Sequence, residues 1–203
     1  MAAAGSYEAD VLAAPEVEAV VLATPAGPPA AQARAALEAG KHVLVEKPLA
    51  LDAASARQLA ALAAARGLVL MPGHTFLYPA AVAMLRQLVQ SGELGAVYYI
   101  ASQRLSLGIV RSDVDALWNL APHDVSIFNH LLGEAPSHAA AVGQACLQPG
   151  VADVQYLHLR YASGRGAHAH LSWLHPRKAR EVVVVGSRKM AIFDDVAPPA
   201  RKL

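Results

Sequence analysis

The 203-residue sequence has a single cysteine, Cys146, so no intrachain disulfide can form, which suits a reducing compartment. Only 16% of the residues are charged and the formal net charge is +1, which gives no electrostatic case for binding nucleic acid or an anionic membrane. Residues 1–10 lack the cationic and apolar segments of a secretory signal. These absences predict a cytoplasmic protein.

Long apolar runs are also missing, because charged residues interrupt the alanine-rich stretches, so we predict no membrane span. The interrupting residues are Arg34, Glu38, Arg57 and Arg66. The composition is nevertheless 55% hydrophobic, with a mean hydropathy of +0.31, which is enough to bury a core.

The first part of the chain alternates strand and helix. Apolar runs at residues 19–23, 42–45 and 68–71 predict buried strands, and helix patterns lie between them at residues 28–39 and 52–66. This βαβαβ order predicts a parallel sheet of the doubly wound type.

The second part has a different pattern. A helix is predicted at about residues 79–89, a strand at 97–102, a polar loop at 103–115 and a helix at 122–132. Five further strand patterns follow without helices between them, at residues 139–147, 153–161, 166–173, 181–185 and 190–193. We therefore predict two domains, residues 1–76 and 77–203, the second an α+β domain with an open, mostly antiparallel sheet.

Polar residues stand where the three parallel strands end, at Thr24-Pro25, Glu46-Lys47-Pro48 and Gly73-His74-Thr75. Open α/β sheets bind their ligands outside the carboxyl ends of their strands. Pro48 holds Lys47 extended, so that its ammonium group can be aimed at a ligand. The alternative is a surface Lys–Glu pair ahead of a turn.

His123 is the second candidate, with Asn119 just upstream. In the first turn of the helix predicted at 122–132, the helix dipole would disfavour the imidazolium form, and a neutral histidine can act as a general base. The alternative is that Asn119 or Asp124 caps the helix and His123 merely packs.

Cationic residues also need an interpretation. Arg104 and Arg111 lie in the predicted polar loop and could hold a carboxylate or diphosphate, whereas residues 177–180 fit a solvated basic turn. His168 and His170 share one face of a strand, but no spacing supplies a third ligand, so we predict no metal site. Cys146 sits in a strand pattern, which predicts a buried side chain.

Four segments together resemble the Gfo/Idh/MocA oxidoreductase family, and the EKP triplet within them is highly specific. The segments are AVVLATP, ALEAGKHVLVEKPLAL, GHTFLYPA and APHDVSIFNHLLGE. Within the family, SQRLSLG, the LWNLAPHD run and SWLHPRK resemble the UDP-N-acetylglucosamine/glucuronate 3-dehydrogenase group. The resemblance implies a Rossmann domain, here its C-terminal half, followed by the α+β domain, whose sheet commonly forms oligomer contacts.

The resemblance also implies roles for individual residues. Lys47 and His123 would be catalytic, the cofactor would meet Thr24, Pro25, Glu46, Lys47 and His74, and the substrate would meet Arg104, Arg111, Asn119 and His123. The cofactor would be NAD, or NADP, and the substrate a sugar or nucleotide-linked sugar. A cis peptide is implied at Lys47-Pro48. Many family members carry aspartate four residues before the histidine, where this chain has Asn119.

The dinucleotide fingerprint G-x-G-x-x-G is absent upstream of Ala19, so we expect an internal fragment of a longer chain. The leading hypothesis is an NAD(P)-dependent dehydrogenase of nucleotide-linked sugars. One alternative is a remnant that binds a sugar or another subunit without catalysis. Another is a dehydrogenase of inositol or a simple sugar.

Overall fold

The computed structural model of this chain describes residues 8–23 and 29–203. It divides into two compact units, one ending at Gly73 and the other running from His74 to Leu203. Each unit has its own hydrophobic core, and each is described by itself. The structure thus has a unit boundary three residues before the Phe76 boundary expected from the sequence.

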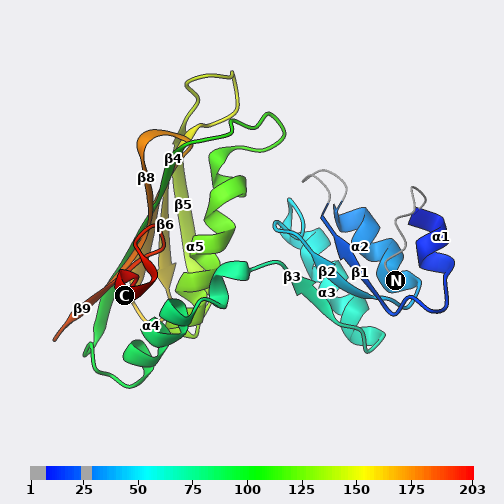
Figure 1. Cartoon of the computed structure of the whole chain (residues 1–203), viewed down its shortest axis with the longest axis horizontal. Helices are drawn as coiled ribbons and strands as arrows, with labels where there is room; N and C mark the ends of the chain where they lie inside the picture. The colour runs from blue at the N-terminus through cyan, green and yellow to red at the C-terminus, as the bar shows by residue number, and fades with distance from the viewer. Residues whose placement is uncertain (1–7, 24–28) are drawn as a thin grey trace. The chain divides into compact units, whose positions relative to one another are not determined.

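The first unit is the predicted βαβαβ arrangement. Its parallel sheet has the order β1 (Ala19–Leu22), β2 (His42–Val45) and β3 (Leu70–Pro72). Helices α1 (Glu8–Ala13), α2 (Pro29–Glu38) and α3 (Ala53–Ala65) accompany the sheet (Figure 1). The central strand β2 buries Val43 and Val45 against the helices, as a strand of a parallel sheet should.

Local signals explain the limits of α3. The Asp52 side chain accepts a hydrogen bond from the Ser55 backbone N–H at 2.7 Å, which caps the first turn. Gly67 adopts a φ of +64°, and the Leu68 N–H donates to the Ala63 carbonyl, so Leu68 closes the helix. For this reason β3 begins two residues later than the sequence pattern predicts.

The second unit is an α+β domain with a mostly antiparallel sheet, as predicted, and this sheet has six strands with helices on one face (Figure 1). The strand order is β5-β6-β7-β4-β8-β9, and only the β4–β7 pair is parallel. The strands are β4 (Val97–Leu107), β5 (Pro136–Gln144), β6 (Val154–Tyr161), β7 (Gly166–Ser172), β8 (Leu174–Gly186) and β9 (Met190–Asp194). The helices are η1 (Thr75–Leu77), α4 (Ala80–Gln90), α5 (Ala116–Leu132) and η2 (Pro199–Arg201).

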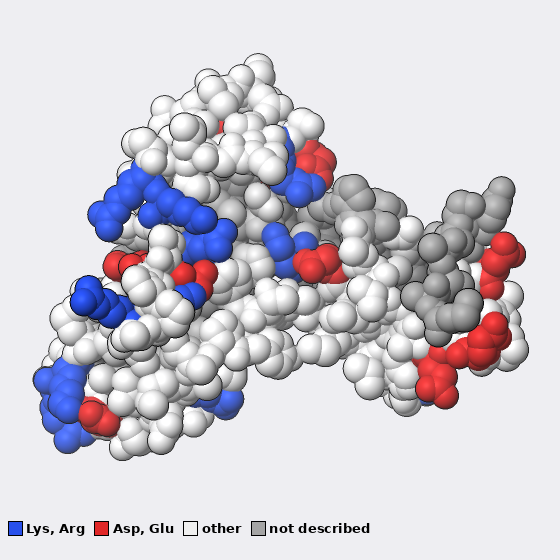
Figure 2. All heavy atoms as spheres, in the orientation of Figure 1, with Lys and Arg blue, Asp and Glu red and all other residues white. Residues whose placement is uncertain are grey.

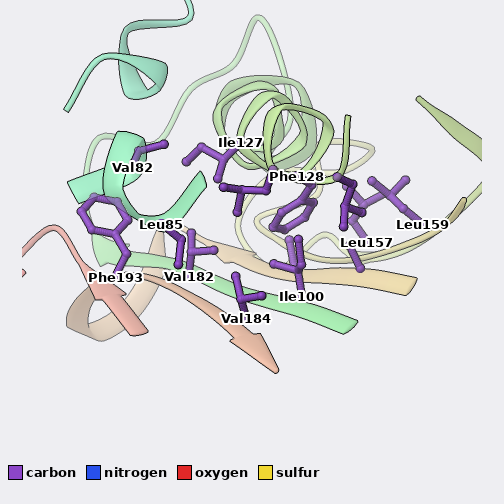
Figure 3. Packing of buried hydrophobic residues seen from close by; sticks show 14 of the residues in the cluster. Val82, Leu85, Ile100, Ile127, Phe128, Leu157, Leu159, Val182, Val184 and Phe193 are labelled. Atoms are coloured by element: carbon purple, nitrogen blue, oxygen red, sulfur yellow. The ribbon is translucent and has the colours of Figure 1, made fainter. Parts of the chain in front are cut away.

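The core of this unit lies between the helices and the sheet. In Figure 3, Ile127 and Phe128 of α5 point toward Ile100 of β4, and α4 contributes Val82 and Leu85. Along β6, buried and exposed residues alternate, so one sheet face packs on the helices and the other is open.

The polar loop expected at residues 103–115 begins later than predicted, because β4 continues to Leu107. Ser102 and Arg104 lie on the buried side of this central strand, which pairs with β7 and β8. Polar residues of this kind are typical of a loop, which is why the strand was predicted to end too early. Inside the unit, Asp124 compensates the charge of Arg104. The basic turn expected at 177–180 is likewise part of strand β8.

Helix α5 begins at Ala116 rather than near Pro122. The Asp115 side chain caps it by accepting a hydrogen bond from the Trp118 N–H at 2.9 Å. Pro122 therefore lies inside the helix, and His123 lies beyond the first turn. The prediction that His123 lies in the first turn of its helix is therefore wrong, and the helix dipole, whose effect fades beyond that turn, does not act on it.

Candidate functional site

The carboxyl end of β2 carries the Glu46-Lys47-Pro48 triplet between its two neighbouring strands. The Glu46 N–H donates to the Leu22 carbonyl and the Gly73 N–H to the Val45 carbonyl, both at 2.8 Å, so the sheet pairing continues one residue past β2. Glu46 is exposed and Lys47 half-buried. The Lys47–Pro48 peptide bond is cis, as the resemblance implied. Thr24 and Pro25, the other predicted cofactor contacts of this edge, lie outside the described residues.

His123 lies on α5, one residue before the buried Asp124 and one helical turn after Asn119. Its imidazole contacts the ring of Phe76 in η1, with ring centroids 4.8 Å apart and planes inclined at 58°. The histidine therefore packs against the Phe76 ring in the interior of the helix, away from the helix terminus. Because Asp115 caps α5, neither Asn119 nor Asp124 is its cap.

Arg104 and Asp124 form a buried ion pair in the same region. Arg104 Nε donates to Asp124 Oδ2 at 2.9 Å and Nη2 donates to Oδ1 at 3.3 Å. The exposed fractions of the two side chains are 8% and 1%. The guanidinium carbon also lies 4.3 Å from the centroid of Phe76. Arg104, Asp124, Phe76 and His123 thus form one connected cluster.

Arg111 is engaged on the surface instead. Its Nε donates to Asp113 Oδ1 at 2.8 Å, and hydrogen bonding from this arginine holds the pKa of Asp113 below its ordinary value. Both arginines that the sequence predicted as anion ligands therefore hold carboxylates of their own chain. Substrate contact by Arg104 or Arg111 stays a prediction.

His74 opens the second unit and is half-buried. Burial lowers the pKa of its imidazole below the ordinary value of 6.5, which favours the neutral form of the ring. Its Nδ1 is buried and has no hydrogen-bond partner among the described residues. A neutral imidazole can donate or accept a hydrogen bond, which suits the predicted cofactor contact.

The structure places Lys47 in the first unit and His123 in the second. The catalytic roles of the two residues stay a prediction. Phe76 and Asp124 are the members of the cluster to which sequence reasoning gave no functional role. The strand alternation that puts Arg104 on the same face as Ile100 was the available signal, because a buried arginine requires a carboxylate partner.

His168 and His170 share the open face of the sheet, as predicted. His158 lies directly opposite His168 on β6, and the His170 ring stacks on Tyr156 with centroids 4.5 Å apart. Among residues 8–23 and 29–203, no group of three or more histidine, cysteine, aspartate or glutamate residues could hold a metal ion. Cys146 follows β5 and is exposed, which corrects the prediction of a buried thiol. No helix within the described residues is both long and apolar enough to cross a membrane.

Comparison with known protein families shows the family to which this chain belongs. Residues 3–74 match a domain described as "Oxidoreductase family, NAD-binding Rossmann fold", and residues 82–192 match the GFO/IDH/MocA C-terminal domain. The chain belongs to the Gfo/Idh/MocA oxidoreductase family. Its first unit is accordingly part of a Rossmann fold, and the NAD prediction is confirmed for the family domain.

Several known proteins are similar to this chain over much of its length. The UDP-N-acetylglucosamine 3-dehydrogenase of Acidithiobacillus ferrooxidans is 38% identical over 133 residues, which is 65% of this chain and 41% of that protein. The uncharacterized oxidoreductase YdgJ of Escherichia coli K12 is 30% identical over 93% of this chain and 57% of its own length. The crystal structure of GenD2 from gentamicin A biosynthesis, in complex with NAD, is 29% identical with a TM-score of 0.88, covering 94% of this chain and 58% of that chain.

The chain thus spans about two fifths to three fifths of the length of these relatives. The sequence contains no G-x-G-x-x-G run ahead of β1, where a Rossmann sheet has its pyrophosphate-binding turn.

Proposed function

We propose that this chain carries the catalytic pair and the substrate domain of an NAD-dependent dehydrogenase that oxidises a hydroxyl group of a nucleotide-linked sugar. The observation that carries the proposal is the Glu46-Lys47-Pro48 triplet at the carboxyl end of β2 in a chain of this family. Similarity to the Acidithiobacillus UDP-N-acetylglucosamine 3-dehydrogenase supports a sugar linked to a nucleotide.

The residues at the carboxyl end of β2 suit the nicotinamide end of NAD. Lys47 offers an ammonium group and Glu46 an exposed carboxylate at the edge where open α/β sheets hold ligands. Bound NAD would accept a hydride from the sugar carbon. We assign Glu46, Lys47 and His74 to the cofactor, together with Thr24 and Pro25.

Side chains of the protein would accept the proton of the sugar hydroxyl group and stabilise the charge left on its oxygen. His123 accepts the proton of the reacting hydroxyl group as the carbon–hydrogen bond breaks, which leaves a carbonyl. The Lys47 ammonium stabilises the negative charge that develops on the oxygen. Asn119, one turn before His123, binds the substrate in this scheme, and Arg111 contributes a guanidinium for an anionic group.

A chimera provides the activity test: residues of this chain replace the matching segment of the Acidithiobacillus relative. With UDP-N-acetylglucosamine and NAD, we expect the absorbance of reduced cofactor to rise. The single substitutions Lys47→Ala and His123→Ala should each lower kcat by about 10²–10⁴-fold, the usual contribution of such groups. Arg165→Lys, in the partly buried ion pair with Glu134, is the control. Full activity in both alanine variants would contradict the proposal.

A second hypothesis is that the chain binds a sugar or another subunit without catalysis. Calorimetric titration of NAD into the 203-residue chain separates the two readings. Binding that Lys47→Ala weakens supports a cofactor site in this chain. Absence of binding, together with an inactive chimera, supports the non-catalytic reading.

We also propose that the open face of the six-stranded sheet forms a contact with a second copy of the chain. The strand registers place small, apolar and imidazole side chains in one row across this face: Ala140, His158, His168, Ala101, Val183 and Ile192. Tyr99 and Tyr156 flank the row and are 42% and 48% exposed. A contiguous face of this kind is typical of a protein–protein contact.

A further inference from the structure

The buried pair of Arg104 and Asp124 has no role in the proton and hydride steps proposed above. A fully buried ion pair gives little net stability, because the two charges lose their hydration. Apolar residues of similar volume would fill the same space at least as well. The pair therefore calls for a reason other than stability, and its neighbours supply one.

Arg104 makes two kinds of contact in the His123 cluster. Its nitrogens hold Asp124, the residue next to His123 on α5, at 2.9 and 3.3 Å. Its guanidinium carbon lies 4.3 Å from the Phe76 centroid, and Phe76 contacts the His123 ring at 4.8 Å. The Arg104 guanidinium thus contacts both the carboxylate of Asp124, the next residue after His123, and the aromatic ring that the imidazole contacts.

We infer that Arg104 is a positioning residue, which holds Asp124 and Phe76 so that the imidazole of His123 keeps one orientation. The inference rests on the proposed function, in which His123 is the general base. A general base must be held within a fraction of an ångström of its productive position, and a misplacement of about 1 Å can lower a rate about 10²-fold. The planar guanidinium suits this task because it can bond a carboxylate through two nitrogens while it covers an aromatic ring.

Two variants separate positioning from simple stability. Arg104→Lys keeps the charge but loses the planar fork. The double substitution Arg104→Met with Asp124→Leu removes both charges, so that neither is left buried without a partner, and should fold. Arg165→Lys is the matched control, since it alters a partly buried Arg–carboxylate pair of the same unit that is not among the contacts of the His123 cluster.

The first readout is the NMR spectrum of the histidine ring protons in the 203-residue chain, with urea unfolding to confirm the fold. We expect the His123 resonances to move in Arg104→Lys and in the double variant, and to stay in place in the Arg165→Lys control. Unchanged His123 resonances in both test variants would overturn the inference.

The second readout is steady-state kinetics in the chimera. We expect kcat to fall about ten- to a hundredfold in both test variants with KM within about threefold, because the substrate contacts remain while the base is displaced. A raised KM at unchanged kcat would overturn the inference and assign Arg104 to substrate binding. The two readouts can also disagree. If the His123 resonances move in the test variants but the chimera with Arg104 intact does not reduce NAD, Arg104 positions the imidazole and the proposed function is rejected.

Discussion

At the scale of single residues, Asp153 is a fully buried carboxylate just ahead of β6. Burial by itself raises the pKa of this carboxyl, but hydrogen bonds from the Leu147 N–H, the Trp173 indole and the Cys146 N–H outweigh it, so the pKa lies below its ordinary value of 3.8. The three donors lie at 2.9, 2.6 and 2.7 Å. The carboxylate therefore ties the β5–β6 connection to the end of β7.

We predict that Asp153→Asn lowers the free energy of unfolding by about 2–4 kcal/mol at pH 7, because an amide cannot accept all three hydrogen bonds and turns its NH₂ group toward donors. A lowered native pKa stabilises the fold above the unfolded value of about 3.9, and this contribution is lost as pH falls through the native pKa. The gap between wild type and variant should narrow in urea titrations from pH 7 to pH 3. A constant gap would show that the carboxylate charge is unimportant.

At the scale of elements, α5 shows where sequence reasoning misjudged a boundary. The proline rule favours Pro122 in a first turn, yet Asp115 caps the helix and the segment from Ala116 is helical ahead of the proline. Two valid helix-start signals competed, and packing decided between them, since Ala116 and Ala121 are buried in the structure. Local patterns predict that such a helix exists better than where it begins.

The cap of α5 yields a test of its own. Asp115→Ala should lower the free energy of unfolding by about 1 kcal/mol, the typical loss when a helix cap is removed, and Asp115→Ser should restore most of it. Thermal unfolding followed by circular dichroism measures both variants. Asp52→Ala, which removes the cap of α3 in the other unit, shows whether the two units unfold separately. An Asp115→Ala protein as stable as wild type would exclude capping by this side chain.

Strand β4 shows why part of the candidate site was not predictable. The apolar pattern gave the strand as far as Ser102, but only the fold shows that Arg104 finds Asp124 twenty residues later in the chain. The parallel strands and their polar carboxyl ends follow from local patterns, as at β2 and Lys47. The partner of a buried charge is a long-range contact, so local sequence patterns around Arg104 do not reveal that Asp124 pairs with it.

At the scale of the whole molecule, charge and apolar surface are distributed unevenly. Most of the Lys and Arg side chains visible in Figure 2 lie on the unit from His74 to Leu203, with acidic side chains among them. The open sheet face of this unit presents instead the row that ends at Val183 and Ile192. This open face is the surface that we propose contacts a second copy.

We predict that Ile192→Lys weakens self-association, because a charge would enter the apolar part of the contact. Sedimentation velocity at several concentrations measures the effect, and Val69→Lys, at another exposed β-branched residue in the first unit, is the control. Dissociation in the Ile192 variant alone is the expected result. Equal association of both variants, or a wild-type chain that stays monomeric at all concentrations, would rule out this face.

The most direct test of hydride transfer uses UDP-N-acetylglucosamine that carries deuterium on the sugar carbon to be oxidised. In the chimera, Lys47 and His123 should together allow transfer of that deuterium to NAD. The reduced cofactor should then be one mass unit heavier than unlabelled reduced cofactor. The substitutions Lys47→Ala and His123→Ala should each suppress the formation of this labelled cofactor. Reduced cofactor without the label, or labelled cofactor formed equally well in the two alanine variants, would contradict the account.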